Sequence, residues 1–337
     1  SSGRKTARVR RKEAAALPDV HGPLMVLGFL GTLIALERAV ALRAAWGYAA
    51  PVLLGLGGVA LVAPVPPLLG RMLLLDGTVA LVAVLVALWR RRRDDEVLVQ
   101  VLAACLAVLA ALAWVRVEAS VVVPLLAGFV VLTIAAERVE LARFHLPRTA
   151  GTTLLWLATG LALAATWALV APGPGSRAFG VALLALVAWL APRDVARRTV
   201  RSTGLPRFSA VAMLAGYGWL TVAGVAWAVT GVPTTRAAHD LLVHTVFLGF
   251  AMSMVLAHAP VILPSVLRRP LPYRRVLWAP LVVLHAGLAV RVCGDLVGQT
   301  RLAQAGGVLT TVALLLLPLT AAASVALPVR HPRSVPA

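Results

Sequence analysis

Long apolar runs alternate with short polar connections along the whole chain. About eleven of these runs have roughly the 17 to 25 residues that a helix needs to cross a bilayer core. They are rich in Leu, Ala and Val and lack the strict alternation of membrane-spanning strands. The pattern predicts an all-α, polytopic transmembrane helical bundle with helices at residues 21–42, 49–69, 72–89, 97–115, 119–141, 151–171, 177–192, 208–230, 238–264, 276–297 and 303–328.

Composition agrees with a bilayer environment, because 60% of the residues are hydrophobic and only 13% are charged. The net charge of +19 would suit a nucleic-acid-binding protein, but the Lys and Arg residues gather in alternate connections. These are the connections after the first, third, fifth, seventh and ninth helices, together with the C-terminal tail. The positive-inside rule places them in the cytoplasm. We therefore expect a multi-pass protein of the inner (plasma) membrane with a cytoplasmic C-terminus, and no nucleic-acid partner.

The two ends of the chain are predicted to lie outside the bundle. Residues 1–20 form a basic tail, residues 21–328 a single transmembrane domain, and residues 329–337 a cytoplasmic tail. The basic tail precedes a helix that this topology starts on the outer side, which conflicts with its charge. Either the tail is translocated, or an upstream helix is missing and the full-length chain has twelve. We favour the missing helix.

Three segments repeat at intervals of about four helices. GFLGTLIALER begins at Gly28 and GFVVLTIAAER at Gly128, with Gly, Phe, Ile, Ala, Glu and Arg at identical spacing. A fainter echo at Gly249 places His258 where the first two segments have Glu. The alternatives are duplication of a helical unit and coincidence in an apolar background. Duplication predicts four-helix repeat units at residues 21–115, 119–230 and 238–328.

Glu37 and Glu137 end the first two repeated segments, and each is followed by an Arg. Ionisable groups within membrane helices are costly to bury and often functional. Two interpretations are open: the carboxylates are neutralised packing partners at the membrane edge, or they belong to a proton relay.

Histidines are the main candidates for binding a cofactor or metal. Of seven in the chain, His239, His244 and His258 lie in the single run 238–264, and His21 opens the first run. The topology puts His21, His239 and His244 near the outer ends of their helices, so a shared site is expected. Asp240 precedes His244 by four residues, a spacing at which its carboxylate can hold one imidazole nitrogen and leave the other free to bind a metal.

Two imidazoles from separate helices are a natural axial pair for haem b, with Arg291 placed to neutralise a propionate. Copper is the rival cofactor, because imidazole suits it and Met25 lies four residues after His21 on the same helical face. His258 and His285 are further candidate metal ligands; at 100° per residue His258 lies about 40° around the helix from His244. The alternative is that each histidine is a hydrogen-bonded interfacial residue.

A histidine before a Gly-Phe pair, the late segment HTVFLGFAMSMVLAHAP and the four-helix periodicity resemble the NnrS family. Its members are haem- and copper-containing membrane proteins linked to nitric oxide stress. The pattern more remotely resembles the catalytic subunit of haem-copper oxidases, which has twelve helices in three arcs and low-spin haem ligands on the second and tenth. With one helix upstream, His21 falls on the second and His244 on the tenth. Residues 119–141 and 151–171 contain no histidine, so the oxidase copper site lacks ligands and oxygen reduction is disfavoured.

These observations predict an integral membrane haem protein, with copper as a possible second metal, acting in nitric oxide or redox stress with nitric oxide or an electron donor as partner. The first alternative is a transporter, in which His285 and His258 line a pathway and the ninth helix is broken at Pro260 and Pro264. The second alternative is a cofactor-free membrane scaffold.

Overall fold

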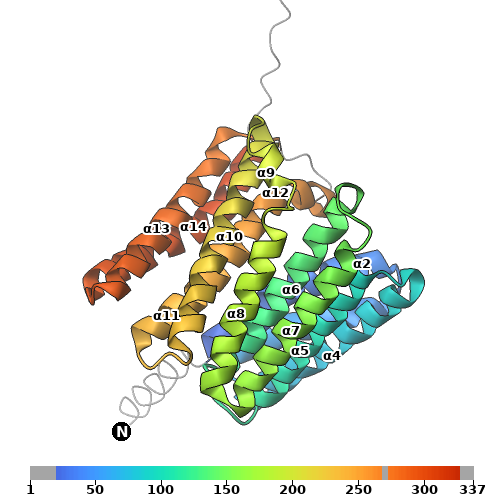
Figure 1. The fold of residues 1–337 in the computed structure, drawn as a ribbon. Coiled ribbons are helices and arrows are strands. Elements are labelled where there is room, and N and C mark those ends of the chain that lie inside the picture. The colour runs from blue at the N-terminus through green and yellow to red at the C-terminus, as the bar shows by residue number, and fades with distance from the viewer. Residues whose placement is uncertain (1–19, 268–271, 327–337) are drawn as a thin grey trace, which may run out of the picture. The chain divides into compact units, whose positions relative to one another are not determined.

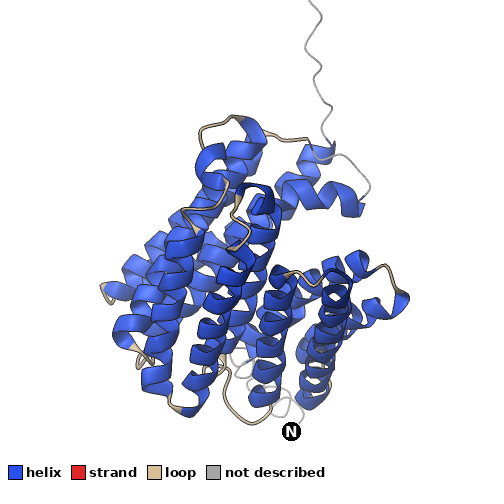
Figure 2. Ribbon diagram, turned by 45° about the vertical axis from the view of Figure 1, so that its right-hand side comes forward, coloured by secondary structure: helices blue, strands red, loops and turns tan. Residues whose placement is uncertain are grey.

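The computed structural model describes residues 20–267 and 272–326, and the part it describes is helical throughout, without strands (Figure 2). The predicted basic tail and C-terminal tail lie outside these residues, apart from Val20. The long helices are α3 (Ala49–Val62), α4 (Pro67–Arg92), α5 (Asp95–Trp114), α6 (Val123–Ala142), α7 (Ala150–Val170), α8 (Pro172–Leu190), α10 (Gly204–Thr230), α13 (Trp278–Leu296) and α14 (Thr300–Ala326).

Two further spans are interrupted helices. The first begins at Val20, passes through the π-helical segment η1 (Leu24–Leu30) and continues as α2 (Gly31–Leu42). The other consists of α11 (Arg236–His244), the π-helical segment η4 (Thr245–Ala251) and α12 (Met252–Leu267). Short helical pieces fill the connections: η2 (Ala45–Tyr48), η3 (Arg143–His145), α9 (Ala196–Thr199) and η5 (Arg275–Leu277).

The prediction of an all-helical membrane-spanning bundle is confirmed, and each predicted span coincides with a helix. Among the described residues, 10 helices are long and apolar enough to cross a bilayer. The remaining predicted span is α6, which is 20 residues long but carries Glu137, Arg138 and Glu140 near its end. Nearly all of its side chains are buried, because neighbouring helices rather than lipid surround it.

Two helices begin several residues before their predicted starts because a proline occupies the first position of each. Pro67 starts α4 and Pro172 starts α8, several residues before the predicted starts at 72 and 177. Proline is favoured in the first turn because its missing N–H would have no partner there. Conversely, the predicted break at Pro260 and Pro264 is wrong: both residues lie inside α12. The transporter interpretation therefore loses its broken helix.

The chain divides into two compact units, residues 1–190 with 224–232 and residues 191–223 with 233–337. In the first unit α5 packs against α4, α6 and α7 (Figure 1), and α3 pairs with α4. In the second unit α13 lies along α14 (Figure 1). Close approach there depends on Gly287, where an added Cβ would lie 2.7 Å from the Cβ of Leu309. Small residues at such contacts are how membrane helices pack tightly.

Arginines close the ends of two helices in the first unit. Arg91 donates from Nη1 to the carbonyl of Leu42 at 2.9 Å, and Arg71 donates to the carbonyl of Trp114 at 3.2 Å while its guanidinium lies 4.6 Å from the Trp114 ring centre. The last carbonyls of a helix have no partner within it, and a cation there also complements the helix dipole. These contacts explain part of the basic residue content without any polyanionic ligand.

Candidate functional site

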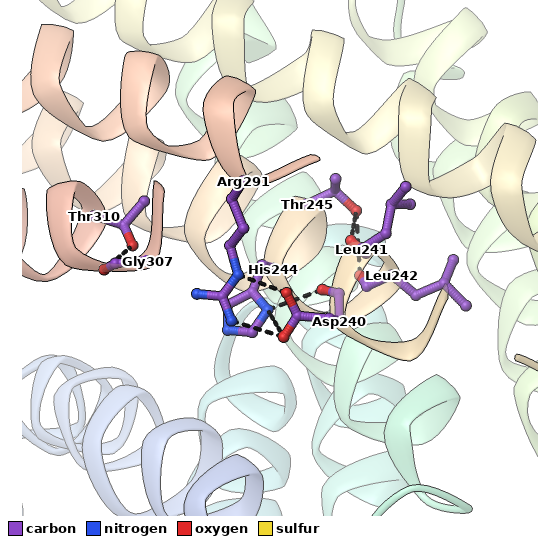
Figure 3. Close-up of polar contacts among 8 residues, drawn as sticks. All are labelled: Asp240, Leu241, Leu242, His244, Thr245, Arg291, Gly307 and Thr310. Atoms are coloured by element: carbon purple, nitrogen blue, oxygen red, sulfur yellow. Dashed lines mark hydrogen bonds and ion pairs between the residues drawn. The ribbon is translucent and has the colours of Figure 1, made fainter. Parts of the chain in front are cut away.

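A charged cluster joins α11 to α13 in the second unit (Figure 3). Arg291 on α13 donates from Nε and Nη2 to the two carboxylate oxygens of Asp240 on α11, at 2.5 and 2.7 Å. Both side chains are about four-fifths buried, with 20% and 23% of their surface exposed. Two parallel charge-assisted hydrogen bonds make this the strongest polar contact type available to a carboxylate.

Gly307 on α14 leaves room for this arrangement. A Cβ at that position would come within 3.3 Å of Nη1 of Arg291, so the guanidinium lies close against the backbone of α14. At the start of α11, the Thr235 side chain accepts a hydrogen bond from the backbone N–H of Ala238 at 3.1 Å. That N-cap fixes where the helix begins and hence the face on which Asp240 and His244 lie.

His244 is oriented by the same aspartate. Its Nδ1 lies 2.8 Å from the backbone carbonyl oxygen of Asp240 and 3.2 Å from carboxylate Oδ1 of the same residue. A carbonyl oxygen only accepts hydrogen bonds, so Nδ1 carries the proton. In the neutral ring Nε2 is then unprotonated, and it makes no hydrogen bond to a described residue. The predicted contact between Asp240 and His244 is therefore present, and it leaves one nitrogen with a free lone pair.

Arg291 was predicted to neutralise a haem propionate, but in the structure its charge is already paired with Asp240. The arginine thus acts on the aspartate, which in turn holds the histidine. The chain of contacts runs from Arg291 through Asp240 to Nδ1 of His244 (Figure 3).

The segment after His244 is not a regular α-helix. Residues Thr245–Ala251 form η4, a π-helix, whose turns are wider than those of an α-helix. Hydroxyl groups occupy both ends: Thr245 donates to the carbonyl of Leu241 at 2.7 Å, and Ser253 donates to that of Gly249 at 2.5 Å. Single π-helical turns inside α-helices occur frequently at functional sites.

The first span has the same local construction. His21 precedes η1 by three residues, and the hydroxyl of Thr32 donates to the carbonyl of Gly28 at 2.5 Å. The Gly of the Gly-Phe pair is thus bound by a hydroxyl four residues later, as in the Gly249–Ser253 pair. The Gly128 repeat differs, because its hydroxyl, on Thr133, bonds to Phe129 and the helix is regular α.

The π-segments lie within the stretches on which two geometric predictions were based. The rotation of about 40° between His244 and His258 assumed 100° per residue throughout, but seven of the intervening residues belong to η4. The π-segment η1 begins at Leu24, so its start lies between His21 and Met25. In the structure His21 is exposed and Met25 half-buried.

The other candidate histidines have distinct surroundings. His258 directs Nδ1 to the carbonyl of Met254 at 2.7 Å. His239 is half-buried, and its ring makes no hydrogen bond to a described residue. His285 accepts a hydrogen bond at Nδ1 from Nε1 of Trp219 at 2.9 Å, and its Nε2 lies 3.5 Å from Oγ of Ser253.

The repeated Glu-Arg pairs of the first unit meet in space. Nη2 of Arg38 lies 2.8 Å from Oε1 of Glu37 and 2.9 Å from Oε1 of Glu137. Arg38 is only 11% exposed and Glu137 25%. One arginine in contact with two carboxylates fits a packing group in which the cation offsets part of the charge of both acids.

Among the described residues, no group of three or more His, Cys, Asp and Glu side chains is placed to hold a metal ion. An axial haem ligand requires only one imidazole per side of the iron, and the free Nε2 of His244 meets that requirement.

Trp219, Ser253 and Gly249 were not predicted as site residues. The sequence held one signal for two of them: each of the Gly-Phe pairs at Gly28 and Gly249 is followed, four residues after Gly, by a hydroxyl residue. No sequence pattern joined Trp219 to His285, because they lie 66 positions apart.

A family model described as "Domain of unknown function (DUF8744)" matches residues 6–326. No curated protein and no solved structure matches the chain.

Proposed function

The chain belongs to the DUF8744 family, and we propose that it is an integral membrane protein that binds haem b near the outer face and acts in nitric oxide or redox stress. His244 is the axial ligand that the geometry supports. His21 is the second ligand on the sequence pattern, and His239 is the alternative to His244.

One observation carries the proposal. In residues 20–267 and 272–326 the π-helical segments are η1 and η4, and each closely follows a histidine proposed as an axial ligand. His244 is adjacent to η4, and His21 lies three residues before η1. π-Helical turns are rare and occur frequently at functional sites. In each unit, a π-turn thus lies beside one of the proposed ligands.

The ring of His244 fits the ligand role. A metal-binding imidazole usually donates its other N–H to a carbonyl or carboxylate, which fixes the tautomer and raises the basicity of the coordinating nitrogen. Nδ1 of His244 makes this contact with Asp240, and Arg291 fixes Asp240 in turn. A carboxylate that shares its charge with an arginine draws the imidazole proton less strongly, which favours a neutral rather than an anionic ring.

Haem, when bound, would supply reversible one-electron chemistry and an iron centre able to interact with nitric oxide. The chain's own contribution is to orient the imidazole of His244 and to keep its Nδ1 protonated. The link to nitric oxide stress rests on the resemblance to the NnrS family. The copper alternative is tested by metal analysis of the same preparation.

The test is haem content in variants of the detergent-purified full chain, expressed with ample haem. His244→Ala and His21→Ala are expected to lose bound haem or its low-spin spectrum. His145→Ala is the matched control, because His145 is exposed in η3, and it is expected to retain wild-type haem. His239→Ala decides whether the alternative ligand is used. Equal haem content and spectra in all four variants would contradict the proposal.

A further inference from the structure

Three helices of the second unit converge on His285. Trp219 of α10 donates its indole N–H to Nδ1 of the ring. An indole only donates, so Nδ1 must be unprotonated, and the neutral ring therefore carries its proton on Nε2. That Nε2–H faces Oγ of Ser253 on α12 at 3.5 Å. With Nδ1 accepting and Nε2 protonated, neither nitrogen directs a lone pair toward a metal.

Both partners of His285 contact η4. Ser253 donates its hydroxyl to the carbonyl of Gly249, in the middle of the π-segment. Trp219 packs against the same glycine: a Cβ on Gly249 would lie 2.5 Å from the Cβ of Trp219 and 3.0 Å from Leu288 on α13. Gly249 is thus enclosed by α10 on one side and α13 on the other, and Ser253 is fully buried.

We propose that Trp219, His285 and Ser253 form a lock that holds η4 in its π-helical form and thereby positions His244. His285 is a positioning residue in this scheme, not a metal ligand. It fixes the indole of Trp219 against Gly249. Its Nε2–H faces the hydroxyl of Ser253, which in turn donates to the carbonyl of Gly249. The ligand role of His244 rests on the proposed function, whereas the lock on η4 does not.

The physical reason is the position of His244 at the start of η4. If η4 relaxed to an α-helix, the wide turn would be lost and the residues on one side of it would rotate relative to those on the other. Asp240 and Arg291 anchor α11, while the lock anchors the far end of η4. Together the two contacts define the direction of the His244 ring between them.

The first test needs no haem. Hydrogen–deuterium exchange of the peptide containing residues 245–251 is measured in detergent for wild type, His285→Leu, His285→Asn and Ser253→Ala. His285→Leu leaves the Trp219 N–H without an acceptor, and exchange is expected to accelerate about tenfold, the factor that one lost hydrogen bond gives. His285→Asn restores an acceptor oxygen near the Nδ1 position and should exchange like wild type. Gly218→Ala in α10, where an added Cβ meets no atom within 4 Å, is the control.

The second test reads the positioning effect on His244. In haem-loaded protein, His285→Leu is expected to keep bound haem but to change the low-spin ferric EPR signal, which responds to imidazole orientation, and His285→Asn to restore it. Unchanged exchange in His285→Leu would overturn the lock, and an unchanged EPR signal despite faster exchange would overturn its effect on His244. Wild-type protein without haem would defeat the proposed function and leave the exchange experiment to decide the lock.

Discussion

The pair formed by Asp240 and Arg291 gives the sharpest stability prediction. Asp240→Ala removes two hydrogen bonds of 2.5 and 2.7 Å and leaves the guanidinium, 20% exposed, without its counter-charge. Breaking a buried ion pair costs about 3 to 5 kcal/mol, and partial exposure favours the lower end. We therefore expect a loss of about 3 kcal/mol, equivalent to a melting temperature lower by roughly 6 to 12 °C.

Thermal unfolding followed by tryptophan fluorescence in detergent measures this loss. Haem content is recorded for each preparation, because a bound ligand raises apparent stability by mass action. The double variant Asp240→Ala with Arg291→Met is the decisive control, since replacing both charges by apolar groups removes the unpaired cation and should recover most of the loss. A double variant as unstable as the sum of the two single variants would refute the reasoning, because independent sites add.

Two further predictions concern packing and charge. Gly249→Ala should destabilise the protein by about 1 to 3 kcal/mol through overpacking against Trp219. Gly218→Ala, where the added Cβ meets open space, should be neutral or slightly stabilising. Equal melting temperatures for these two variants would contradict the close contact between Gly249 and Trp219. Arg38→Met should lower the melting temperature because Glu137 then keeps a mostly buried charge without its partner. Adding Glu137→Gln to this variant should restore the melting temperature. A double variant as unstable as Arg38→Met alone would show that the two side chains do not pair in solution.

The sequence predicted the fold well because bilayer-crossing helices must satisfy their own backbone hydrogen bonds. Apolar run length therefore locates them. It located the helix boundaries less well near Pro67 and Pro172. Pro67 was placed at the end of the span 49–69 and Pro172 in a connection, although each proline starts a helix. The π-segments were not predicted, since a π-turn depends on local hydroxyl bonds and neighbouring helices rather than on hydrophobic periodicity.

The candidate site was predicted where the contacts are local. Asp240 and His244 are one helical turn apart, so their spacing alone predicted the contact that the structure contains. Contacts between distant positions were missed. Arg291 was assigned to a propionate although Asp240, 51 positions away, binds it, and the partnership of Trp219 with His285 had no local signal. The Gly28 and Gly128 repeat indicated related helices, and the structure adds that Arg38 joins their glutamates.

The measurement that tests the central claim most directly is an optical spectrum of the detergent-purified full chain, oxidised and dithionite-reduced, with metal analysis of the same sample. The account predicts a Soret band, sharp α and β bands on reduction, and about one iron per chain, as expected for haem held by two imidazoles. A spectrum without these bands, from protein expressed with ample haem and containing no iron, would contradict it.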